Sequence, residues 1–290
     1  MMGWIFGFLI FVVVLFAAVT YMLYWYDTAN GPAFEQLQSL SRGKARRWLV
    51  RGFLWAVAAQ ITALVTFPLG WIPKRKGAAP RSGSTDPIVV PVHGLYHNRS
   101  AFIFLERALR RAGIQDIHPW TYSSWKAEFL SLAEKLRGHL ETLHRSAPSR
   151  PILLVGHSLG GLLARHAATT AHEGTVSGCL TLGSPHQGSR LAVFAVGTLG
   201  KSLGYRSVLF ETLESLENRR PEPSFPCVAL ASPVDNMVLP QEALVPPGAH
   251  WQFRWTSPMS HVAMLYHPEV LHVVVSWVKE ASAQNRSPMA

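Results

Sequence analysis

The stretch PILLVGHSLGGLLARHAA, residues 151–168, decides the fold of this chain of 290 residues. Residues 151–155 are fully apolar and predict a buried strand, and residues 160–171 follow with the pattern of a helix. The turn between them reads G-x-S-x-G, with a glycine on each side of Ser158. Small residues allow a turn sharp enough to expose the serine, and the N–H groups and dipole of the next helix face it. The stretch therefore predicts Ser158 as a nucleophile.

A nucleophilic serine needs a base, and the base needs a carboxylate that orients it. After this kind of turn the chain order is serine, then acid, then histidine. The sequence has four aspartates, and only Asp235 follows Ser158, in the stretch ALASPVDNMVLP just after a predicted strand. We expect Asp235 to be the acid rather than a turn-capping residue. Five glutamates are alternatives, but they lie in helical or proline-rich stretches typical of solvated surfaces: Glu211, Glu214, Glu217, Glu222 and Glu242.

The base is expected among the four histidines that follow Asp235. His261 stands in SPMSHVAML, a loop between the last predicted strand and the last predicted helix. Such a loop can bring the imidazole over Ser158, so His261 is the expected base. His250 is its rival. His267 is expected to cap the last helix, and His272 to pack within it.

Two backbone N–H groups are needed to stabilise the oxyanion that forms on the substrate. One is expected from Leu159, directly after the nucleophile, and the other from Leu95 in the loop VPVHGLYHN that follows an early strand. Each such donor contributes about 100- to 1000-fold in rate. His93 and His157 stand beside these positions, and both are interpreted as structural supports.

Strand and helix patterns alternate from about residue 88 to residue 281. This alternation predicts an α/β fold with a mostly parallel sheet flanked by helices on both faces, and a site at the carboxyl ends of the strands. A short tail, 282–290, follows. The predicted strands are 87–94, 117–122, 151–155, 177–182, 226–231 and 251–255, and the predicted helices are 101–111, 128–145, 160–171 and 268–279.

Residues 1–76 predict a membrane anchor. The runs 3–26 and 52–72 carry no charged side chain, and each has the roughly 20 residues that a transmembrane helix needs. We expect the first to be a retained helix rather than a cleaved signal peptide, which has a basic start and a shorter apolar run. The second contains several polar residues and a proline, so it is either a second span or a helix lying on the membrane or on the domain. Residues 77–87, GAAPRSGSTDP, predict a linker.

The net charge of +10 is concentrated near these apolar runs, because residues 1–86 hold nine basic and three acidic side chains. We expect the basic residues to contact anionic lipid headgroups. Basic clusters flank the second run on both sides, so the orientation stays open: one span leaves the domain in the cytoplasm and two spans leave it outside. The sequence shows no nucleic-acid-binding motif, so no nucleic-acid partner is expected.

Together these residues resemble the bacterial lipases and esterases of the α/β-hydrolase fold, over most of residues 88–278. TLGSPHQGS (181–189) resembles a stretch of true lipases, and SHVAMLYHPEVLHVVVSWV resembles the catalytic-histidine segment of small lipases, with Ser260 and Ala263 where glycines are usual. The resemblance implies a hydrolase without a cofactor, here anchored in a bacterial inner membrane. Larger lipases of this group bind calcium through aspartates near the histidine. Because no aspartate follows Asp235, no metal is expected.

The sequence thus predicts a membrane-anchored serine ester hydrolase that acts on acyl esters of lipids through an acyl-enzyme. Alternatives with the same triad are an acyltransferase, a thioesterase and a deacylase of glycosylphosphatidylinositol-like lipids. A non-catalytic lipid- or protein-binding scaffold would not need the full serine–acid–histidine order. The apolar segment 189–224 is either a lid over the site or a crossover helix. The two cysteines, Cys179 and Cys227, are expected to be buried thiols.

Overall fold

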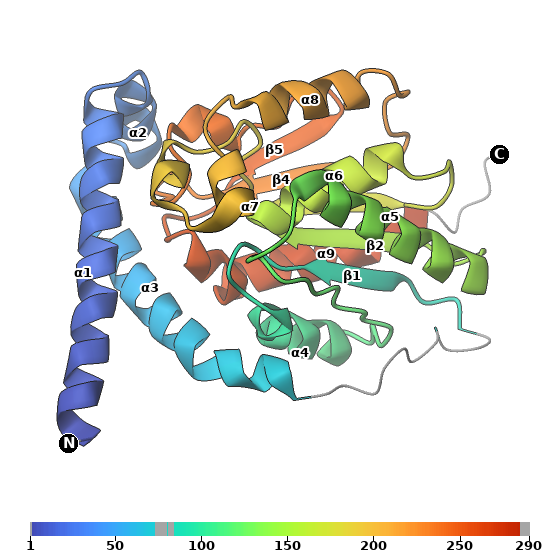
Figure 1. Cartoon of the computed structure of the whole chain (residues 1–290), viewed down its shortest axis with the longest axis horizontal. Coiled ribbons are helices and arrows are strands. Elements are labelled where there is room, and N and C mark those ends of the chain that lie inside the picture. The colour runs from blue at the N-terminus through green and yellow to red at the C-terminus, as the bar shows by residue number, and fades with distance from the viewer. Residues whose placement is uncertain (1, 73–79, 81–83, 285–290) are drawn as a thin grey trace.

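Five parallel strands form the centre of the computed structural model, which describes residues 2–72, 80 and 84–284. Neighbours in the sheet are also neighbours in the chain, in the order β1-β2-β3-β4-β5 (Figure 1). All residues of the first four strands are buried, as their uninterrupted apolar runs require. The predicted parallel sheet is confirmed. The strands are β1 (Ile88–Val92), β2 (Ile152–His157), β3 (Gly178–Leu182), β4 (Cys227–Ala231) and β5 (Trp251–Trp255).

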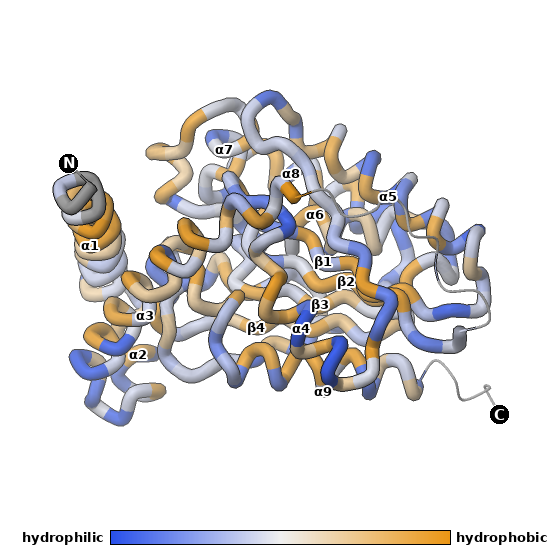
Figure 2. Tube along the Cα trace, turned by 90° about the horizontal axis from the view of Figure 1, so that it is seen from below, coloured by the Kyte–Doolittle hydropathy of each residue, from blue (hydrophilic) through white to orange (hydrophobic). Residues whose placement is uncertain are grey.

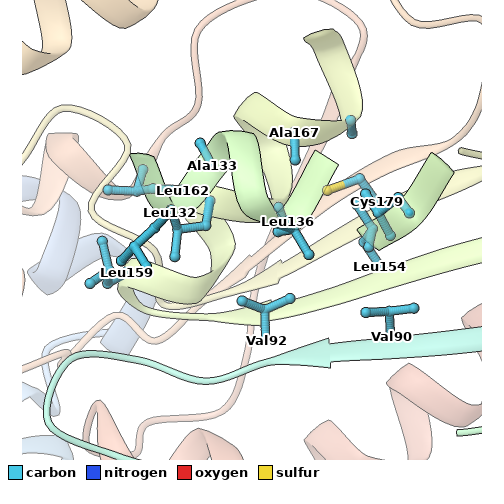
Figure 3. Packing of buried hydrophobic residues seen from close by; sticks show 14 of the residues in the cluster. Val90, Val92, Leu132, Ala133, Leu136, Leu154, Leu159, Leu162, Ala167 and Cys179 are labelled. Carbon is cyan, nitrogen blue, oxygen red and sulfur yellow. The ribbon is translucent and has the colours of Figure 1, made fainter. Parts of the chain in front are cut away.

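Different helices cover the two faces of the sheet, because successive residues of a strand point to opposite sides. Ile152 and Leu154 of β2 belong to the cluster packed under α5 and α6, which Figure 3 shows. Leu153 and Val155 face the other way, toward α4 and α9. The bounds of these helices are α4 (Ile103–Arg111), α5 (Phe129–Ser146), α6 (Leu159–Thr170) and α9 (Pro268–Gln284).

The predicted strand at 117–122 is reduced to two isolated bridges with β1, at Ile117 and Trp120. The N–H groups of His118 and Trp120 donate to carbonyls of β1 at 2.8 and 2.9 Å. Between these two bonds the ladder is interrupted, because Pro91 of β1 has no N–H to donate to the carbonyl of His118. The prediction of a regular strand at 117–122 was therefore wrong, although the segment runs alongside β1. The predicted helix at 101–111 begins as a 3₁₀ turn, η2 (Arg99–Phe102).

The N-terminal part of the chain folds into helices that stand beside the domain (Figure 1). By length and composition, residues 7–29 and 45–71 could each cross a membrane. α3 begins before the uncharged run, at Ala45, and gives way to a 3₁₀ turn at Pro68, whose ring does not fit a continuing helix. The short helix α2 was not predicted. The bounds are α1 (Met2–Ala29), α2 (Ala33–Ser41), α3 (Ala45–Thr66) and η1 (Phe67–Trp71).

The surfaces of α1 and α3 are largely apolar and open. Only 28% of the α1 span and 22% of the α3 span is buried, so neither is the core helix of a soluble fold. Figure 2 shows α1 at one end of the molecule with hydrophobic residues along it. An apolar surface of this size is typical of contact with a membrane or another protein. Most of the predicted linker, 77–87, and the tail beyond Gln284 lie outside the described residues.

The segment 189–224 contains a crossover helix and, before it, an exposed apolar part. The helix α8 (Val208–Glu217) crosses between β3 and β4 and buries Phe210 and Leu213 in the cluster with α6, as a crossover helix does. Before it, η3 (Arg190–Phe194) and α7 (Gly197–Ser202) leave Val193, Phe194 and Val196 exposed. These three residues are named here the apolar rim. The structure therefore has the expected crossover helix at α8, and a lid formed by the part before it stays a prediction.

Cys179 and Cys227 stand opposite each other on β3 and β4 as buried free thiols. Burial raises the pKa of both, that of Cys227 to about 12. The thiol form therefore dominates at neutral pH, which makes both side chains inert parts of the core.

Candidate active site

Ser158 sits on the turn between β2 and α6 with φ 54° and ψ −126°, a backbone conformation that non-glycine residues rarely adopt. Two glycines make the turn possible. A Cβ at Gly156 would lie 2.3 Å from the backbone of Gly161, and a Cβ at Gly160 would lie 2.0 Å from the carbonyl oxygen of Val92. Both distances are far inside van der Waals contact. The local sequence thus forces the strained turn at the end of β2 that presents Ser158.

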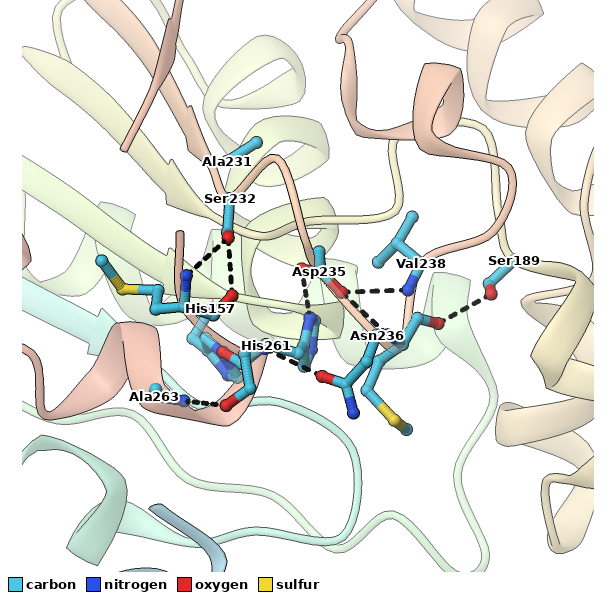
Figure 4. Close-up of polar contacts among 12 residues, drawn as sticks. His157, Ser189, Ala231, Ser232, Asp235, Asn236, Val238, His261 and Ala263 are labelled. Carbon is cyan, nitrogen blue, oxygen red and sulfur yellow. Dashed lines mark hydrogen bonds and ion pairs between the residues drawn. The ribbon is translucent and has the colours of Figure 1, made fainter. Parts of the chain in front are cut away.

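Asp235 lies in the loop after β4 and is fully buried, and it meets His261 there (Figure 4). The Nδ1–H of His261 donates to Oδ2 of Asp235 at 2.8 Å. The other carboxylate oxygen, Oδ1, accepts the N–H groups of Met237 and Val238 at 2.9 and 3.1 Å. Because Nδ1 carries the proton, Nε2 of a neutral His261 has a free lone pair that can accept a proton.

The backbone of His261 is held from both sides. Its N–H donates to Oδ1 of Asn236 at 3.2 Å, and its carbonyl accepts Nε2–H of His157 at 3.2 Å. Burial, with the neighbouring His261 as the next cause, holds the pKa of His157 well below its usual value. His157 is therefore a neutral donor that supports His261 rather than a second base. Ser232 joins the loops that bear Asp235 and His261, because its Oγ donates to the carbonyl of Met259 at 2.6 Å.

The loop after β1 lies directly against Ser158. A Cβ at Gly94 would lie 3.0 Å from the Cβ of Ser158. Tyr96 has a φ of 57°, and its N–H donates to Oγ of Ser124 at 3.0 Å. Within the described part of the chain, the N–H of Leu95 has no acceptor. Leu159 is the first residue of α6, where helix geometry also leaves the N–H without a carbonyl partner. Leu159 thus directly follows Ser158, and Leu95 directly follows the glycine that approaches it; among the described residues neither N–H has an acceptor.

His93 packs flat against Tyr122, with ring centroids 4.3 Å apart. Its Nε2 accepts the N–H of Tyr122 at 3.3 Å, which leaves the proton on Nδ1, 2.9 Å from the carbonyl oxygen of Gly94. Burial lowers the pKa of His93 to about 4. A histidine that is neutral and has both ring nitrogens bonded supports the loop, in agreement with its expected structural role.

The other histidines after Asp235 lie elsewhere. The ring of His250 lies tilted beside Trp251, and its Nδ1 is 3.6 Å from a carboxylate oxygen of Glu222. His267 packs its ring against Trp55 of α3 at 4.7 Å, and His272 lies on α9. Of the four, His261 is the one that meets Asp235. Among the described residues, no group of three or more His, Cys, Asp or Glu side chains could hold a metal ion.

The structure also brings in residues that the sequence did not single out. Gly183, at the end of β3 with φ +55°, lies where a Cβ would be 3.1 Å from Oδ2 of Asp235. Asn236 directly follows Asp235, and that adjacency was the only signal for it in the sequence. Gly183 belongs to TLGSPHQGS, so the stretch that resembled lipases lies against Asp235. In the same stretch, His186 has a lowered pKa because it is buried, and it bonds Thr181 at 3.1 Å.

Residues 127–197 match the family described as PGAP1-like alpha/beta domain. Over 45 residues the chain is 51% identical to the GPI inositol-deacylase of Candida albicans. That match covers 15% of this chain and 12% of the fungal protein.

Solved structures of lipases are similar over most of the chain. Aspergillus fumigatus lipase B matches with a TM-score of 0.57 and 15% identity, covering 72% of this chain and 55% of the lipase. The mature form of Bacillus licheniformis lipase BlEst2 matches with a TM-score of 0.51 and 20% identity, covering 70% of this chain and 96% of that one. The chain therefore has the α/β-hydrolase fold of lipases and esterases.

Proposed function

We propose that this protein is a membrane-anchored serine hydrolase that cleaves an acyl ester of a lipid. The observation that carries the proposal is the Asp235–His261 pair, bonded at 2.8 Å and buried, next to the strained turn that presents Ser158. Buried acid–base pairs of this kind orient the imidazole and stabilise it when it becomes charged. Besides water, this chemistry needs only side chains and backbone N–H groups.

In the proposed reaction Ser158 Oγ attacks the acyl carbonyl carbon, and its proton passes to Nε2 of His261. The carbonyl oxygen becomes an oxyanion that accepts the N–H groups of Leu95 and Leu159. The ester C–O bond then breaks, and the leaving alcohol takes the proton from Nε2. Water attacks the acyl-enzyme, gives a proton to His261 and releases the carboxylic acid, after which the proton returns to Ser158.

The surroundings of the site favour a lipid substrate. The carboxyl ends of the strands point toward α1 and α7 (Figure 1). Tyr96, in the oxyanion loop, donates through its hydroxyl to the carbonyl of Val196 in the apolar rim. Ser189, just before that rim, donates to the carbonyl of Met237 in the acid loop at 2.8 Å. An exposed apolar segment that joins the two halves of the site, beside two apolar helices, suits a substrate held in a lipid surface.

A narrower candidate is removal of an acyl chain from the inositol of a glycosylphosphatidylinositol-like lipid. The match of residues 127–197 to the PGAP1-like alpha/beta domain and the local identity to a GPI inositol-deacylase favour it. The chemistry is unchanged, since an inositol ester is also an oxygen ester. What differs is the alcohol that leaves.

The first test is hydrolysis of nitrophenyl esters of increasing chain length, in detergent, by the full chain and by Ser158→Ala. We expect activity and covalent labelling by a fluorophosphonate in the wild type, and neither in the variant. Loss of both in a variant of unchanged thermal midpoint supports the proposal. A wild type that neither turns over nor becomes labelled contradicts it. Labelling without hydrolysis, together with acyl transfer to an added alcohol, would favour a transferase.

The second test separates the lipid classes. Vesicles containing phosphatidylinositol with a labelled acyl chain on the inositol ring are compared with vesicles labelled in the glycerol acyl chains. Release from the inositol alone supports the narrower candidate, and release from glycerol esters supports a general lipase.

A further inference from the structure

The C-terminal half of α1 carries polar side chains that an apolar anchor does not need. They face the loop 232–241, which bears Asp235. The hydroxyl of Tyr21 donates to the carbonyl of Val234 at 3.0 Å, and that of Tyr24 donates to the carbonyl of Pro233 at 2.8 Å. α1 is therefore bonded to the loop that bears the acid.

Thr20 of α1 contacts a side chain of the same loop rather than its backbone. Nδ2 of Asn236 donates to Oγ1 of Thr20 at 2.7 Å, and both side chains are at least nine-tenths buried. The hydroxyl of Thr20 is within 3.0 Å of the carbonyl of Phe16 one turn earlier and donates there. The Thr20 oxygen is thus left as an acceptor, and only the NH₂ side of the Asn236 amide satisfies it.

This bond decides which way the amide of Asn236 points. With the NH₂ group on Thr20, the Oδ1 atom faces the backbone N–H of His261, 3.2 Å away. The opposite orientation would place two donors against each other at His261 and leave Thr20 without a donor. A buried amide with both ends bonded has one allowed orientation, and here the anchor helix supplies one of the two bonds.

We propose that Thr20 of the anchor helix is a positioning residue for the base, acting through Asn236 on the backbone of His261. The proposal rests on the function proposed above, because it needs His261 to be the base. The helix then does more than hold the domain at the membrane: it completes the set of bonds that places the imidazole against Asp235 and toward Ser158. The contacts of Tyr21 and Tyr24 end on carbonyls of the loop, so they fix the docking of the helix but not the orientation of this amide.

The test uses the full chain in detergent micelles, with a short soluble nitrophenyl ester so that substrate access to a membrane plays no part. Thr20→Val removes the acceptor and keeps the shape. A buried donor left unpaired corresponds to roughly a tenfold effect, so we expect kcat and the rate of fluorophosphonate labelling to fall about tenfold with KM unchanged. Thr20→Ser keeps the hydroxyl and is expected to restore kcat to within about twofold of wild type.

The matched control is Thr62→Val on α3. Thr62 also donates to the carbonyl four residues earlier, that of Ala58 at 2.8 Å, but it contacts neither loop of the site. Its substitution is expected to leave kcat unchanged. Equal kcat and equal labelling rates in wild type and Thr20→Val would overturn the proposal, as would a loss in Thr20→Val that Thr20→Ser shares.

A double-variant cycle shows whether the effect passes through Asn236. Once Asn236→Ala has removed the amide, adding Thr20→Val should lower kcat less than twofold further. The same tenfold loss in both backgrounds would mean that Thr20 acts through general packing, which contradicts the proposal. A wild type that is not labelled at Ser158 would remove the proposed function and this inference together, whereas a labelled wild type with an unaffected Thr20→Val removes this inference alone.

Discussion

Gly183 leaves the space that Asp235 occupies: a methyl group at Gly183 would lie 3.1 Å from Oδ2 of Asp235 and 3.2 Å from Nδ1 of His261. The position also has a φ of +55°, which L-residues rarely adopt. One glycine thus satisfies two requirements, a backbone turn at the end of β3 and room for the Asp235–His261 pair.

Gly183→Ala is expected to lower kcat at least tenfold, because the added methyl displaces the carboxylate from the imidazole, and to cost about 1–2 kcal/mol of stability from backbone strain. The measurement is kcat on a nitrophenyl ester together with the thermal midpoint. Gly174→Ala is the control, since Gly174 also has a positive φ, +77°, but nothing lies within 4 Å of its Cβ position. It should lose stability and keep kcat. A Gly183→Ala protein of wild-type kcat would contradict the assignment.

Asp235→Asn is expected to lower kcat about 1,000- to 10,000-fold, because an amide can donate to Nδ1 of His261 and leave the proton on the wrong nitrogen. Steady-state kinetics and the rate of fluorophosphonate labelling measure it. Asp116→Asn is the contrasting variant. Asp116 is buried in an ion pair with Arg150 beside the amino ends of β1 and β2, whereas Asp235 lies beyond the carboxyl end of β4. The Asp116→Asn protein should lose about 3–5 kcal/mol of stability, and the fraction that remains folded should keep the wild-type kcat.

Stability is expected to fall as the pH is lowered from 6.5 to about 4. Burial lowers the pKa of His93 to about 4, and those of His157 and His186 fall as well, from an ordinary value of 6.5. In this window the unfolded chain binds protons that the folded chain does not, so acid favours unfolding; above pH 6.5 this contribution to stability is complete. Thermal midpoints measured across this pH window would show how steeply stability depends on pH.

A variant without the buried imidazole tests the cause of that slope. His93→Gln should unfold with a shallower dependence on pH between 6.5 and 4. His172→Gln changes an exposed histidine, and its slope should equal that of wild type. Parallel slopes for all three proteins would mean that other groups cause the acid sensitivity.

Val193→Asp is expected to lower the hydrolysis of vesicle lipids about tenfold and to leave the hydrolysis of a short soluble ester unchanged. The reason is that a charge in the apolar rim removes the favourable transfer of one valine, about 1.5–3 kcal/mol, from the contact with lipid. Val208→Asp is the matched control, because both valines are 74% exposed and Val208 begins the crossover helix α8 instead. Equal losses in the two variants, or a loss on the soluble ester, would speak against a lipid-facing rim.

Much of the architecture is determined by local patterns. The apolar run that ends in Gly156, the glycines around Ser158 and the helical pattern beyond them require only neighbouring residues, so the strand, turn and helix were predicted within a few residues. The alternation of strands and helices then predicts a parallel sheet, because the crossovers leave no other arrangement. The segment 117–122 was the exception, because Pro91 of β1 has no N–H to continue the ladder beside it.

The sequence by itself determined the candidate nucleophile and, through chain order, a small set of candidate acids and bases. It could not determine which of their polar atoms form hydrogen bonds. Only the tertiary structure decided that His261 rather than His250 reaches Asp235, that Gly183 leaves space for this pair, and that Asn236 connects it to Thr20. These contacts join residues that lie tens to hundreds of positions apart, and their geometry follows from how the sheet and α1 pack. Local periodicity carries information about neighbours along the chain, whereas a hydrogen bond between distant side chains exists only once the packing has brought its two atoms together.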